Sequence, residues 1–499
     1  MTPPPPAYQR ARTRSGALPL STQIYQGIGA LPETLQSFAF LTLLLFYYNQ
    51  VLGLPATHAS FALMISLVID AFADPLVGSL SDAFHSRLGR RHPFMYASAL
   101  PLGVALVAAF SPPAGLSHAG LFAWLLGSAV AARLAMSFFS VPWNALYAEL
   151  SDDYVERSAV VMWRYVVGWA GGLAFVLCVW SFVFPSTPEY TPGHLNPHAY
   201  GTFAILLGGA VALSALLSTH LTLRDVPYLL QPVAGSERAS WRGFVRDLAL
   251  AATNRDFVLL VVAILVTAAI AGTGTALDIY MLTYFWGLLP EDLRWFAFAI
   301  AGSALAFVAI PWLQLRFEKH KLLIACALFN LVNGFAVVGL RFAGVLPENG
   351  DRRLLAILIA NSVVRVAADT IAGIMFASMV ADTLDAQELA VGRRQEGLFS
   401  AALSFAGKAT TGLGVMIGGF LLERVIEMPS VASGVALDVG TSSRLGAVAG
   451  LGLPLFYLLP ISLVVFYRIT RTRHAEIRAQ LEQGRSPAPV TPSSQTDSG

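Results

Sequence analysis

The sequence predicts an all-α membrane protein with twelve transmembrane helices in two six-helix halves. Three observations support this fold class. The chain of 499 residues is 56% hydrophobic, with a mean hydropathy of +0.63. Charged residues make up 12% of it, against about 25% in soluble domains. Apolar runs of about 18 or more residues recur along the chain, and one polar segment divides them into two equal sets.

Each predicted span is an apolar run bounded by polar residues or by Pro and Gly turns, and is long enough to cross a bilayer as a helix. The spans are predicted at 25–52, 58–82, 93–111, 119–141, 160–184, 200–219, 256–286, 292–316, 321–344, 354–381, 397–422 and 446–469.

The longest strongly polar interruption is a basic linker at 223–255. It separates one six-helix bundle at 23–222 from a second at 256–475. The arm at 1–22 contains prolines and arginines but no signal-peptide pattern. The tail at 476–499 is rich in Ser, Pro and Gln and has too few apolar residues to offset the entropy cost of ordering. Both ends are therefore predicted to be disordered.

The distribution of Lys and Arg predicts the orientation. If both termini are cytoplasmic, the cytoplasmic segments hold 22 of the 32 basic residues and the outside loops hold 6. Cytoplasmic loops of membrane proteins carry an excess of Lys and Arg. We therefore expect an integral protein of the inner (plasma) membrane with both termini in the cytoplasm.

Composition and motifs exclude several classes of function. The formal net charge of +2 gives no electrostatic case for nucleic-acid binding. Cys178 and Cys326 lie in apolar runs and form neither a disulfide framework nor a metal-ligand pattern. The sequence contains no phosphate-binding loop, no nucleophile elbow and no His or Cys spacing that suits a metal. It predicts neither an enzyme nor a cofactor.

Two carboxylates lie in the middle of the second predicted span. Asp70 and Asp74 have the i,i+4 spacing that places two side chains on one face of a helix, about 6 Å apart. Each costs about 2.5–3.5 kcal/mol to insert near the centre of a bilayer. The functional interpretation makes them a cation and substrate site, with Na⁺ as one candidate ion. The alternative is a buried pair neutralised by packing or protonation.

Lys408 is expected at the same depth as this pair. Asp70 lies twelve residues from Asp82 at the cytoplasmic end of its helix, and Lys408 lies twelve residues from Glu396 at the same end of the eleventh span. At about 1.5 Å per residue, both reach about 18 Å into the membrane. The aspartates then provide a counter-charge whose strength changes when a cation or proton binds. The alternative is a static salt bridge between the halves.

The loop after the second span carries small and charged residues that we interpret as a conformational latch: Gly78, Asp82, Arg87, Gly89, Arg90 and Arg91. The glycine at 78 would allow close helix approach, and the arginines would hold the loop to anionic lipids. For Arg90 and Arg91, the alternative is that they only obey the positive-inside rule. The loop resembles the signature of the major facilitator superfamily, whose two halves rock around a site near the membrane midplane.

Further stretches resemble the glycoside-pentoside-hexuronide cation symporter family, to which the melibiose carriers belong. They are Asp70-Ala-Phe-Ala-Asp74-Pro75-Leu-Val-Gly78, Gly89-Arg-Arg-His-Pro93-Phe94, Val141-Pro142-Trp143-Asn144-Ala145-Leu146 with Glu149-Leu150, Ala381-Asp382-Thr-Leu-Asp385, and Gly392-Arg393-Arg394-Gln-Glu396-Gly397. These stretches span both halves. The resemblance implies the major facilitator fold and cation-coupled sugar transport.

The resemblance also implies roles for single residues. Asp70 and Asp74 match the acidic pair that the family uses for sugar hydroxyls and the coupling cation, and Lys408 matches a nearby lysine of the eleventh helix. Arg164 matches an arginine of the fifth helix associated with the site. Ser140 departs from the pattern, because melibiose-type members place an acid at this point of the fourth helix. The departure removes one expected sugar ligand and counts against galactoside specificity.

Other residues within the spans are weaker candidates. Arg133 lies at mid-depth on the fourth span without an evident local partner and is assigned to the lining of a central cavity. Trp143 is the favoured aromatic for stacking on a sugar ring, ahead of Tyr47, Trp169 and Tyr280. Most tryptophans are nevertheless expected to be interfacial anchors.

Three further charges have no assigned function. Arg365 and Asp369 are i,i+4 on the tenth span and are expected to neutralise each other. Asp278, near the outer end of the seventh span, is either an outer gate or a solvated helix end.

The sequence thus predicts a monomeric secondary active transporter that moves a sugar or glycoside together with H⁺ or Na⁺. Asp70 and Asp74 would bind the cation and the sugar, Lys408 would compensate their charge in the empty site, and Arg164 or Arg133 would complete the polar lining. Two alternatives stay open. One is a carrier of lysophospholipids or other amphiphiles, and the other is a non-transporting sensor or assembly factor built on a transporter scaffold.

Overall fold

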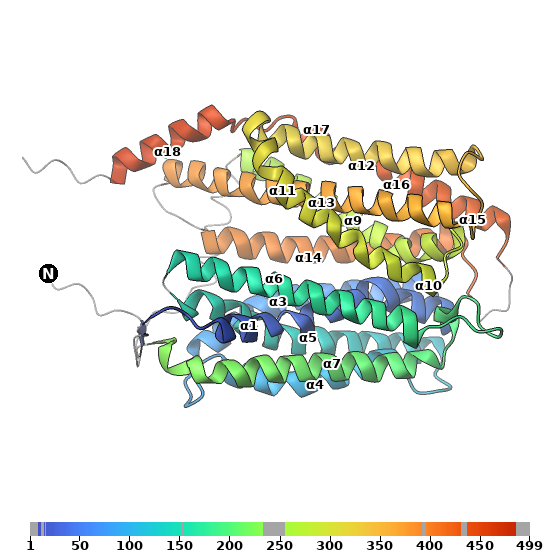
Figure 1. Cartoon of the computed structure of the whole chain (residues 1–499), viewed down its shortest axis with the longest axis horizontal. Coiled ribbons are helices and arrows are strands. Elements are labelled where there is room, and N and C mark those ends of the chain that lie inside the picture. Colours follow the sequence, from blue (N-terminus) through green and yellow to red (C-terminus); the bar gives the residue numbers. More distant parts are fainter. Residues whose placement is uncertain are drawn as a thin grey trace, which may run out of the picture.

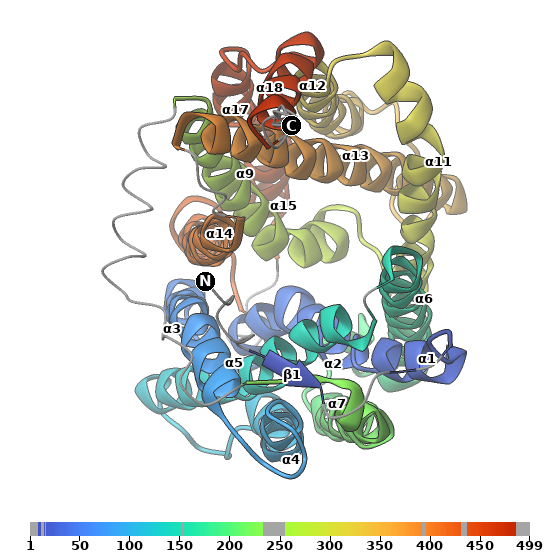
Figure 2. The same ribbon diagram turned by 90° about the vertical axis from the view of Figure 1, so that its left-hand side faces the viewer.

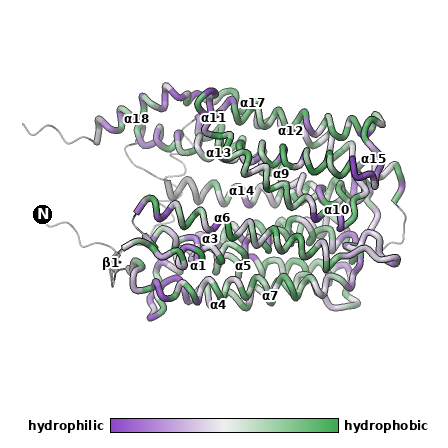
Figure 3. Tube along the Cα trace, in the orientation of Figure 1, coloured by the Kyte–Doolittle hydropathy of each residue, from purple (hydrophilic) through white to green (hydrophobic). Residues whose placement is uncertain are grey.

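The structure is a computed structural model that describes residues 8–10, 14, 16–151, 153–232, 255–391, 396–430 and 437–485. Long helices run along the longest axis of the molecule (Figure 1). Twelve helical segments of the described part are long and apolar enough to cross a membrane. Hydrophobic residues occupy the middle of the helices, and hydrophilic residues gather mainly towards their ends (Figure 3). The predicted all-α fold class with twelve spans is confirmed.

The first half contains six spans. They are built from α1 (Leu20–Ile28), α2 (Leu31–Phe38), η1 (Ala39–Leu44) and η2 (Tyr47–Val51); α3 (Ala56–Ala83); α4 (His92–Phe110); α5 (His118–Leu150); α6 (Tyr154–Cys178) and η3 (Val179–Val183); and, after the short η4 (Gly193–Leu195), α7 (Ala199–Thr222) and η5 (Leu223–Tyr228). The η elements are short π-helical or 3₁₀ turns that continue or connect the α-helices.

The second half contains the other six. They are built from α9 (Arg255–Tyr280) and η6 (Met281–Phe285); α10 (Pro290–Leu293), η7 (Arg294–Ile300) and α11 (Ala301–Arg316); α12 (Lys319–Phe342); α13 (Arg352–Val391); α14 (Glu396–Phe420) and η8 (Leu421–Val425); and α15 (Val439–Gly446), η10 (Ala447–Gly452), α16 (Leu453–Leu455) and α17 (Leu458–Val464). A further helix, α18 (Arg471–Arg485), follows the last span.

Figure 2 views the molecule from the end that carries strand β1 and helix α18, with the first half below and the second half above. We call this end the termini side, and the opposite end, which carries α10 and α15, the distal side. Helix α14 packs along α9 in its own half and along α3 in the other. Gly272 and Gly414 make the α9–α14 crossing close, because a Cβ atom at either would overlap a carbonyl oxygen of the facing helix. The crossing fixes the helix that carries Lys408.

The N-terminal arm is attached to the end of the first half. Strands β1 (Tyr8–Arg10) and β2 (Leu230–Pro232) form a two-stranded antiparallel sheet. The Arg14 guanidinium lies 2.6 Å from Asp225 Oδ1. For residues 8–10, 14 and 16–22 the structure therefore differs from the disordered arm predicted at 1–22, because long-range pairing places them in a way that their local composition does not reveal; the other residues of the arm lie outside the described part.

Two spans continue as helices beyond their predicted ends on the termini side. Helix α5 passes through Pro142 and ends at Leu150, nine residues beyond the predicted end at 141. Helix α13 continues to Val391, ten residues beyond the predicted 381. Hydropathy indicates where a helix leaves apolar surroundings, whereas backbone hydrogen bonds decide where it ends.

Helix α18 reaches to Arg485 and overlaps the tail predicted to be disordered at 476–499. Its buried Ile477 and the partly buried Leu481 pack into a hydrophobic cluster that includes Met379 of α13. The polar composition of the tail concealed this i,i+4 pair, which gives one face of the helix a packing surface. The tail prediction is wrong for the helical residues, and residues 486–499 lie outside the described part.

Candidate functional site

Three charged side chains meet between the two halves. Lys408 of α14 lies with Nζ 2.8 Å from Asp70 Oδ2 and 2.6 Å from Asp74 Oδ2, both on α3. The i,i+4 spacing on α3 points both carboxylates to the same side, as the sequence predicts. We call these residues the charge centre. In the chain, Lys408 is 338 residues from Asp70 and 334 residues from Asp74.

Helix α5 supplies the remaining contacts of the first aspartate. Ser137 Oγ donates to Asp70 Oδ1 at 2.8 Å. Arg133 Nη1 lies 3.6 Å from Asp70 Oδ2, and its Nε donates to Ser66 Oγ at 3.2 Å. The guanidinium also stands over the ring of Phe40, at 5.2 Å from the centroid. The structure therefore places Arg133, which the sequence assigns to the lining of a central cavity, beside Asp70, and adds Ser137, a hydroxyl residue of a kind too common in helices to be selected from the sequence.

The two aspartates differ in accessibility. The Asp70 side chain is 8% exposed, whereas that of Asp74 is 26% exposed and that of Lys408 is 32% exposed. Asp74 Oδ1 has no hydrogen-bond partner in the described part of the chain, although the atom is buried. With Arg133, the four ionised side chains would sum to zero charge. Asp74 is therefore the more accessible of the two acids, and its spare acceptor Oδ1 is buried in this conformation.

A resident metal is not indicated at this centre. Among the described residues, no group of three or more His, Cys, Asp or Glu side chains has an arrangement that could hold a metal ion. Two carboxylates are too few to complete the oxygen shell that hard cations take in dedicated protein sites. A Na⁺ ion at Asp70 and Asp74 would need further oxygens from the main chain, water or the substrate.

Arg164 and Trp143 form a second, separate group. Arg164 lies over the Trp143 ring at 3.9 Å from its centroid and donates to Asn144 Oδ1. Trp143 is 1% exposed, and its Nε1 donates to the carbonyl of Gln26 at 3.0 Å. Between described residues, no ion pair joins Arg164 to either acid of the charge centre. The buried indole has no free face for a sugar ring in this conformation.

One of the other aromatic candidates lines a cavity. Trp169 of α6 borders a mostly apolar cavity of about 180 Å³ between the halves, together with Thr34, Phe38 and Ile300. Its ring also stacks on Phe307 of α11, with 6.0 Å between centroids. Tyr47 and Tyr280, the remaining candidates, are buried.

The predicted latch is built around an acid that the sequence analysis did not select. Glu149, near the end of α5, lies with Oε1 2.5 Å from Nη2 of both Arg90 and Arg91. Asp82 lies further away, with Oδ1 3.4 Å and 3.3 Å from the same two side chains. Both arginines are buried, so they do more than obey the positive-inside rule. The signal available in the sequence was the position of Glu149 inside the family-like motif.

The other latch residues contribute unequally. Gly89 has φ of 80°, a left-handed conformation that favours glycine, and it turns the loop into α4. A Cβ at Gly78 would meet only Val141 Cγ1 at 3.6 Å, which is ordinary contact, so the expected close helix approach does not require this glycine. Arg87 is exposed.

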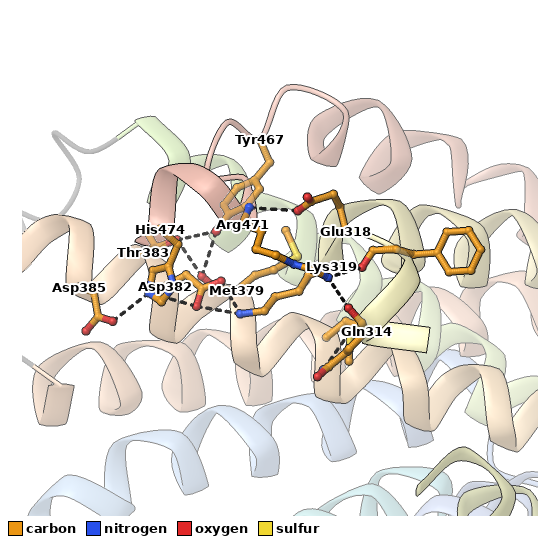
Figure 4. Close-up of polar contacts among 12 residues, drawn as sticks. Gln314, Glu318, Lys319, Met379, Asp382, Thr383, Asp385, Tyr467, Arg471 and His474 are labelled. Carbon is orange, nitrogen blue, oxygen red and sulfur yellow. Dashed lines mark hydrogen bonds and ion pairs between the residues drawn. The ribbon is translucent and has the colours of Figure 1, made fainter. Parts of the chain in front are cut away.

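The second half carries a corresponding cluster on the termini side (Figure 4). Lys319, at the start of α12, places Nζ 2.8 Å and 2.6 Å from the two oxygens of Asp382 on α13. His474 of α18 lies 3.0 Å from Asp385 Oδ2 and 3.5 Å from Asp382 Oδ1. Arg471 reaches backbone carbonyls at the end of α11. The two halves thus share a pattern. A basic residue at the junction between the second and third spans of the half pairs with an acid near the end of the fourth span.

The unassigned charges of the second half do not pair as expected. Arg365 Nη2 lies 3.8 Å from Asp278 Oδ1 on α9. Asp369 instead accepts a hydrogen bond from Asn330 Nδ2 at 2.8 Å. Among the described residues, Arg365 and Asp369 therefore make their direct polar contacts with other helices rather than with each other. The family-like stretch at 392–395 lies outside the described residues.

Polar contacts join the two halves on the distal side. Tyr280 Oη donates to Asn49 Oδ1 at 3.0 Å, and Tyr284 Oη donates to Gln50 Oε1 at 2.7 Å. These pairs link η2, at the end of the first span, to the end of the seventh.

Two carboxylates of the second half add to this closure. Glu291 of α10 accepts from Ser186 N at 2.9 Å and from Ser186 Oγ at 3.0 Å. Glu423 of η8 accepts from Thr57 N, at the start of α3, at 2.9 Å. We call these contacts, with the two tyrosine pairs, the distal gate.

Comparisons with known proteins agree with this architecture. A family described as MFS/sugar transport protein matches residues 25–471. A Synechocystis protein named as an uncharacterized symporter is 26% identical over 93% of this chain and 97% of its own. The isoprimeverose transporter of Lactiplantibacillus pentosus is 22% identical, over 77% of this chain and 75% of its own. These matches confirm the resemblance that the sequence motifs carry, and they are transporters rather than enzymes.

The fold also resembles solved transporter structures. A partially occluded inward-open structure of the xylose transporter XylE from E. coli superposes with a TM-score of 0.58. The alignment covers 91% of this chain and 98% of that one, at 13% sequence identity. At this identity the likeness establishes the major facilitator fold alone.

Proposed function

We propose that this chain, which belongs to the MFS/sugar transport protein family, is a symporter that moves a sugar or glycoside together with H⁺ or Na⁺. The observation that carries the proposal is the charge centre. Lys408 of one half contacts both aspartates of the other, at 2.8 Å and 2.6 Å. A scaffold without transport activity has no reason to bear the insertion cost of these charges.

The coupling step follows from charge balance. In the empty site, Lys408 and Arg133 together balance the charge of the acid pair, and Lys408 holds α14 against α3. A proton or Na⁺ arriving at Asp74 competes with the ammonium group, because one carboxylate cannot fully satisfy both cations. Release of Lys408 frees carboxylate oxygens for sugar hydroxyls, so cation and sugar each strengthen the binding of the other.

The polar lining suits a neutral polyol. Asp74 offers an acceptor, Oδ1, that no described residue hydrogen-bonds, and Arg133 offers guanidinium donors beside Asp70. Donors and acceptors within one site are what vicinal hydroxyl groups require. The name of the isoprimeverose transporter supports a glycoside as the substrate class.

Alternating access would open and close the distal gate. Its contacts join side-chain or backbone groups of the two halves, and rocking of the halves about the charge centre would separate them. If both termini are cytoplasmic, as the basic residues predict, the distal gate is the outer gate and this conformation is closed to the outside.

The proposal is tested by transport in proteoliposomes. The wild-type protein should accumulate a radiolabelled glycoside when a Na⁺ or H⁺ gradient is imposed, and Asp74→Asn should abolish accumulation. The matched control is Glu189→Gln, which neutralises an exposed loop acid and should leave accumulation unchanged. Full gradient-driven accumulation by Asp74→Asn would contradict the mechanism.

A second candidate function is carriage of an amphiphile, which the apolar cavity beside Trp169 favours. A cavity of about 180 Å³ with mostly apolar walls suits an alkyl segment better than a sugar. A thermal-shift screen of the purified protein separates the two candidates. Stabilisation by glycosides supports the sugar symporter, and stabilisation by lysophospholipids alone supports the amphiphile carrier.

A further inference from the structure

His194 is a buried titratable residue at the distal gate that the coupling mechanism does not use. It lies in η4, in the connection between the fifth and sixth spans, and its side chain is fully buried. Its Nε2 atom lies 3.0 Å from Thr283 Oγ1, which belongs to η6 of the other half. The imidazole is thus a hydrogen-bonded contact between the halves.

The surroundings of the ring are aromatic. Phe46 and Trp180 flank it, with ring centroids at 5.2 Å and 5.8 Å. The second ring nitrogen, Nδ1, is buried and has no hydrogen-bond partner among the described residues. An imidazole in this position is accommodated while neutral, whereas an imidazolium would leave a charged N–H group without a partner.

The titratable groups near this ring are tyrosines. Tyr200 of α7 donates through its hydroxyl group to the His194 carbonyl oxygen at 2.9 Å. Tyr280 of α9 and Tyr284 of η6 do not contact the imidazole directly but pack on Phe46, with ring centroids 5.2 Å and 6.3 Å from that of Phe46. Tyrosines have an ordinary pKa near 10 and are uncharged at neutral pH. They supply no counter-charge for an imidazolium.

We propose that His194 is a proton-responsive residue of the distal gate, which holds the halves together while neutral and favours opening of that side once protonated. Opening separates His194 from Thr283 and exposes the ring to water, where an imidazolium is hydrated. Protonation therefore favours the open state through the difference in hydration, without any change at the charge centre.

The size of the effect follows from linkage. In the closed state, burial lowers the pKa of His194 to about 3. In the hydrated open state, the pKa returns towards the ordinary value of about 6.5. Because the closed state binds the proton more weakly, the ratio of open to closed molecules rises as the pH falls below about 6.5. Between pH 7.5 and pH 5 the ratio should rise about 30-fold.

The test measures the opening directly. Spin labels at Glu189→Cys and Glu348→Cys, two exposed loop positions on opposite halves of the distal side, report the distance across the gate. Cys178 and Cys326 are replaced by serine, and the protein is placed in lipid nanodiscs. In the histidine-containing protein, the long-distance population measured by double electron–electron resonance should grow between pH 7.5 and pH 5.

Two variants isolate the histidine. His194→Gln keeps a hydrogen-bonding side chain but cannot take up the proton, so the pH response should disappear. His198→Gln removes an exposed histidine four residues away and should leave the response intact. A distance distribution that does not change with pH would overturn the proposal, as would a response that persists in His194→Gln.

The inference rests on alternating access but not on the identity of the substrate. The measurement needs no sugar and no ion gradient. A pH response in a protein that fails to accumulate glycosides would therefore refute the proposed function alone, whereas accumulation without a pH response would refute this inference alone.

Discussion

The clusters on the termini side of the two halves have the same plan but different chemistry. In the first half, two arginines whose side chains are 6% and 8% exposed enclose Glu149. In the second half, Lys319 is 33% exposed and shares Asp382 with His474 of helix α18. The first cluster is therefore a buried group of ion pairs. The second is a partly exposed contact that includes His474 of α18, a helix outside the twelve spans.

The difference shows how the two halves can move unequally. A planar guanidinium supplies several donors to a carboxylate and cannot lose its charge, whereas an ammonium group is a hydrated point charge on a flexible stem. Contacts of the second kind are also weakened by salt when they are exposed. The second half should thus rearrange more readily on the termini side.

Removal of the buried acid of the first cluster, Glu149, should give the largest loss of stability. Glu149→Gln removes the carboxylate that lies 2.5 Å from the buried Arg90 and Arg91, so it should lower the free energy of unfolding by about 3–5 kcal/mol. Unfolding in detergent micelles with a chemical denaturant measures the change. Asp82→Asn is the control and should cost at most about 1 kcal/mol, because Asp82 is 49% exposed. A larger loss in the control would mean that the acid of the latch is misidentified.

Removal of the corresponding acid in the second half should give a smaller effect. Asp382→Asn leaves Lys319, which water can reach, and should cost about 1–3 kcal/mol in the same assay. The loss should shrink at high salt, whereas the loss in Glu149→Gln should not. Equal losses in the two variants would remove the distinction between a buried and a partly exposed contact.

The smallest change in stability should come from Tyr467, which follows the last span and contacts α13 next to the second cluster. Its Oη donates to the Met379 carbonyl at 3.3 Å, and burial raises the pKa of its phenol above the ordinary value of 10. Its contribution to stability is therefore complete below pH 10 and is lost as the pH rises above that value. The thermal midpoint should fall between pH 9 and pH 11 less steeply in Tyr467→Phe than in the wild type. An unchanged slope in the variant would assign the alkaline loss to other groups.

The sequence predicted what depends on short stretches of chain. Twelve spans follow from runs of apolar residues, and the common depth of Asp70 and Lys408 follows from the regular rise of a helix. The i,i+4 spacing was enough to pair Asp70 with Asp74. These are local properties, and each element carries them before it packs.

Only the tertiary structure decided which predicted residues share a site. The rotation of α5 and α6 about their axes brings Arg133 to Asp70 and leaves Arg164 over Trp143. The span boundaries do not reveal this rotation, because nearly every face of these helices is apolar and hydropathy gives no preferred side.

Contacts between distant parts of the chain were equally hidden. Glu149 with Arg90, and His194 with Thr283, join residues 59 and 89 positions apart. The depth of a residue along a helix is thus a property of the sequence. The sequence by itself determined the fold class and the three members of the charge centre. Partnership across helices depends on how the surfaces fit, and the tertiary structure alone decided the latch acid and the distal gate.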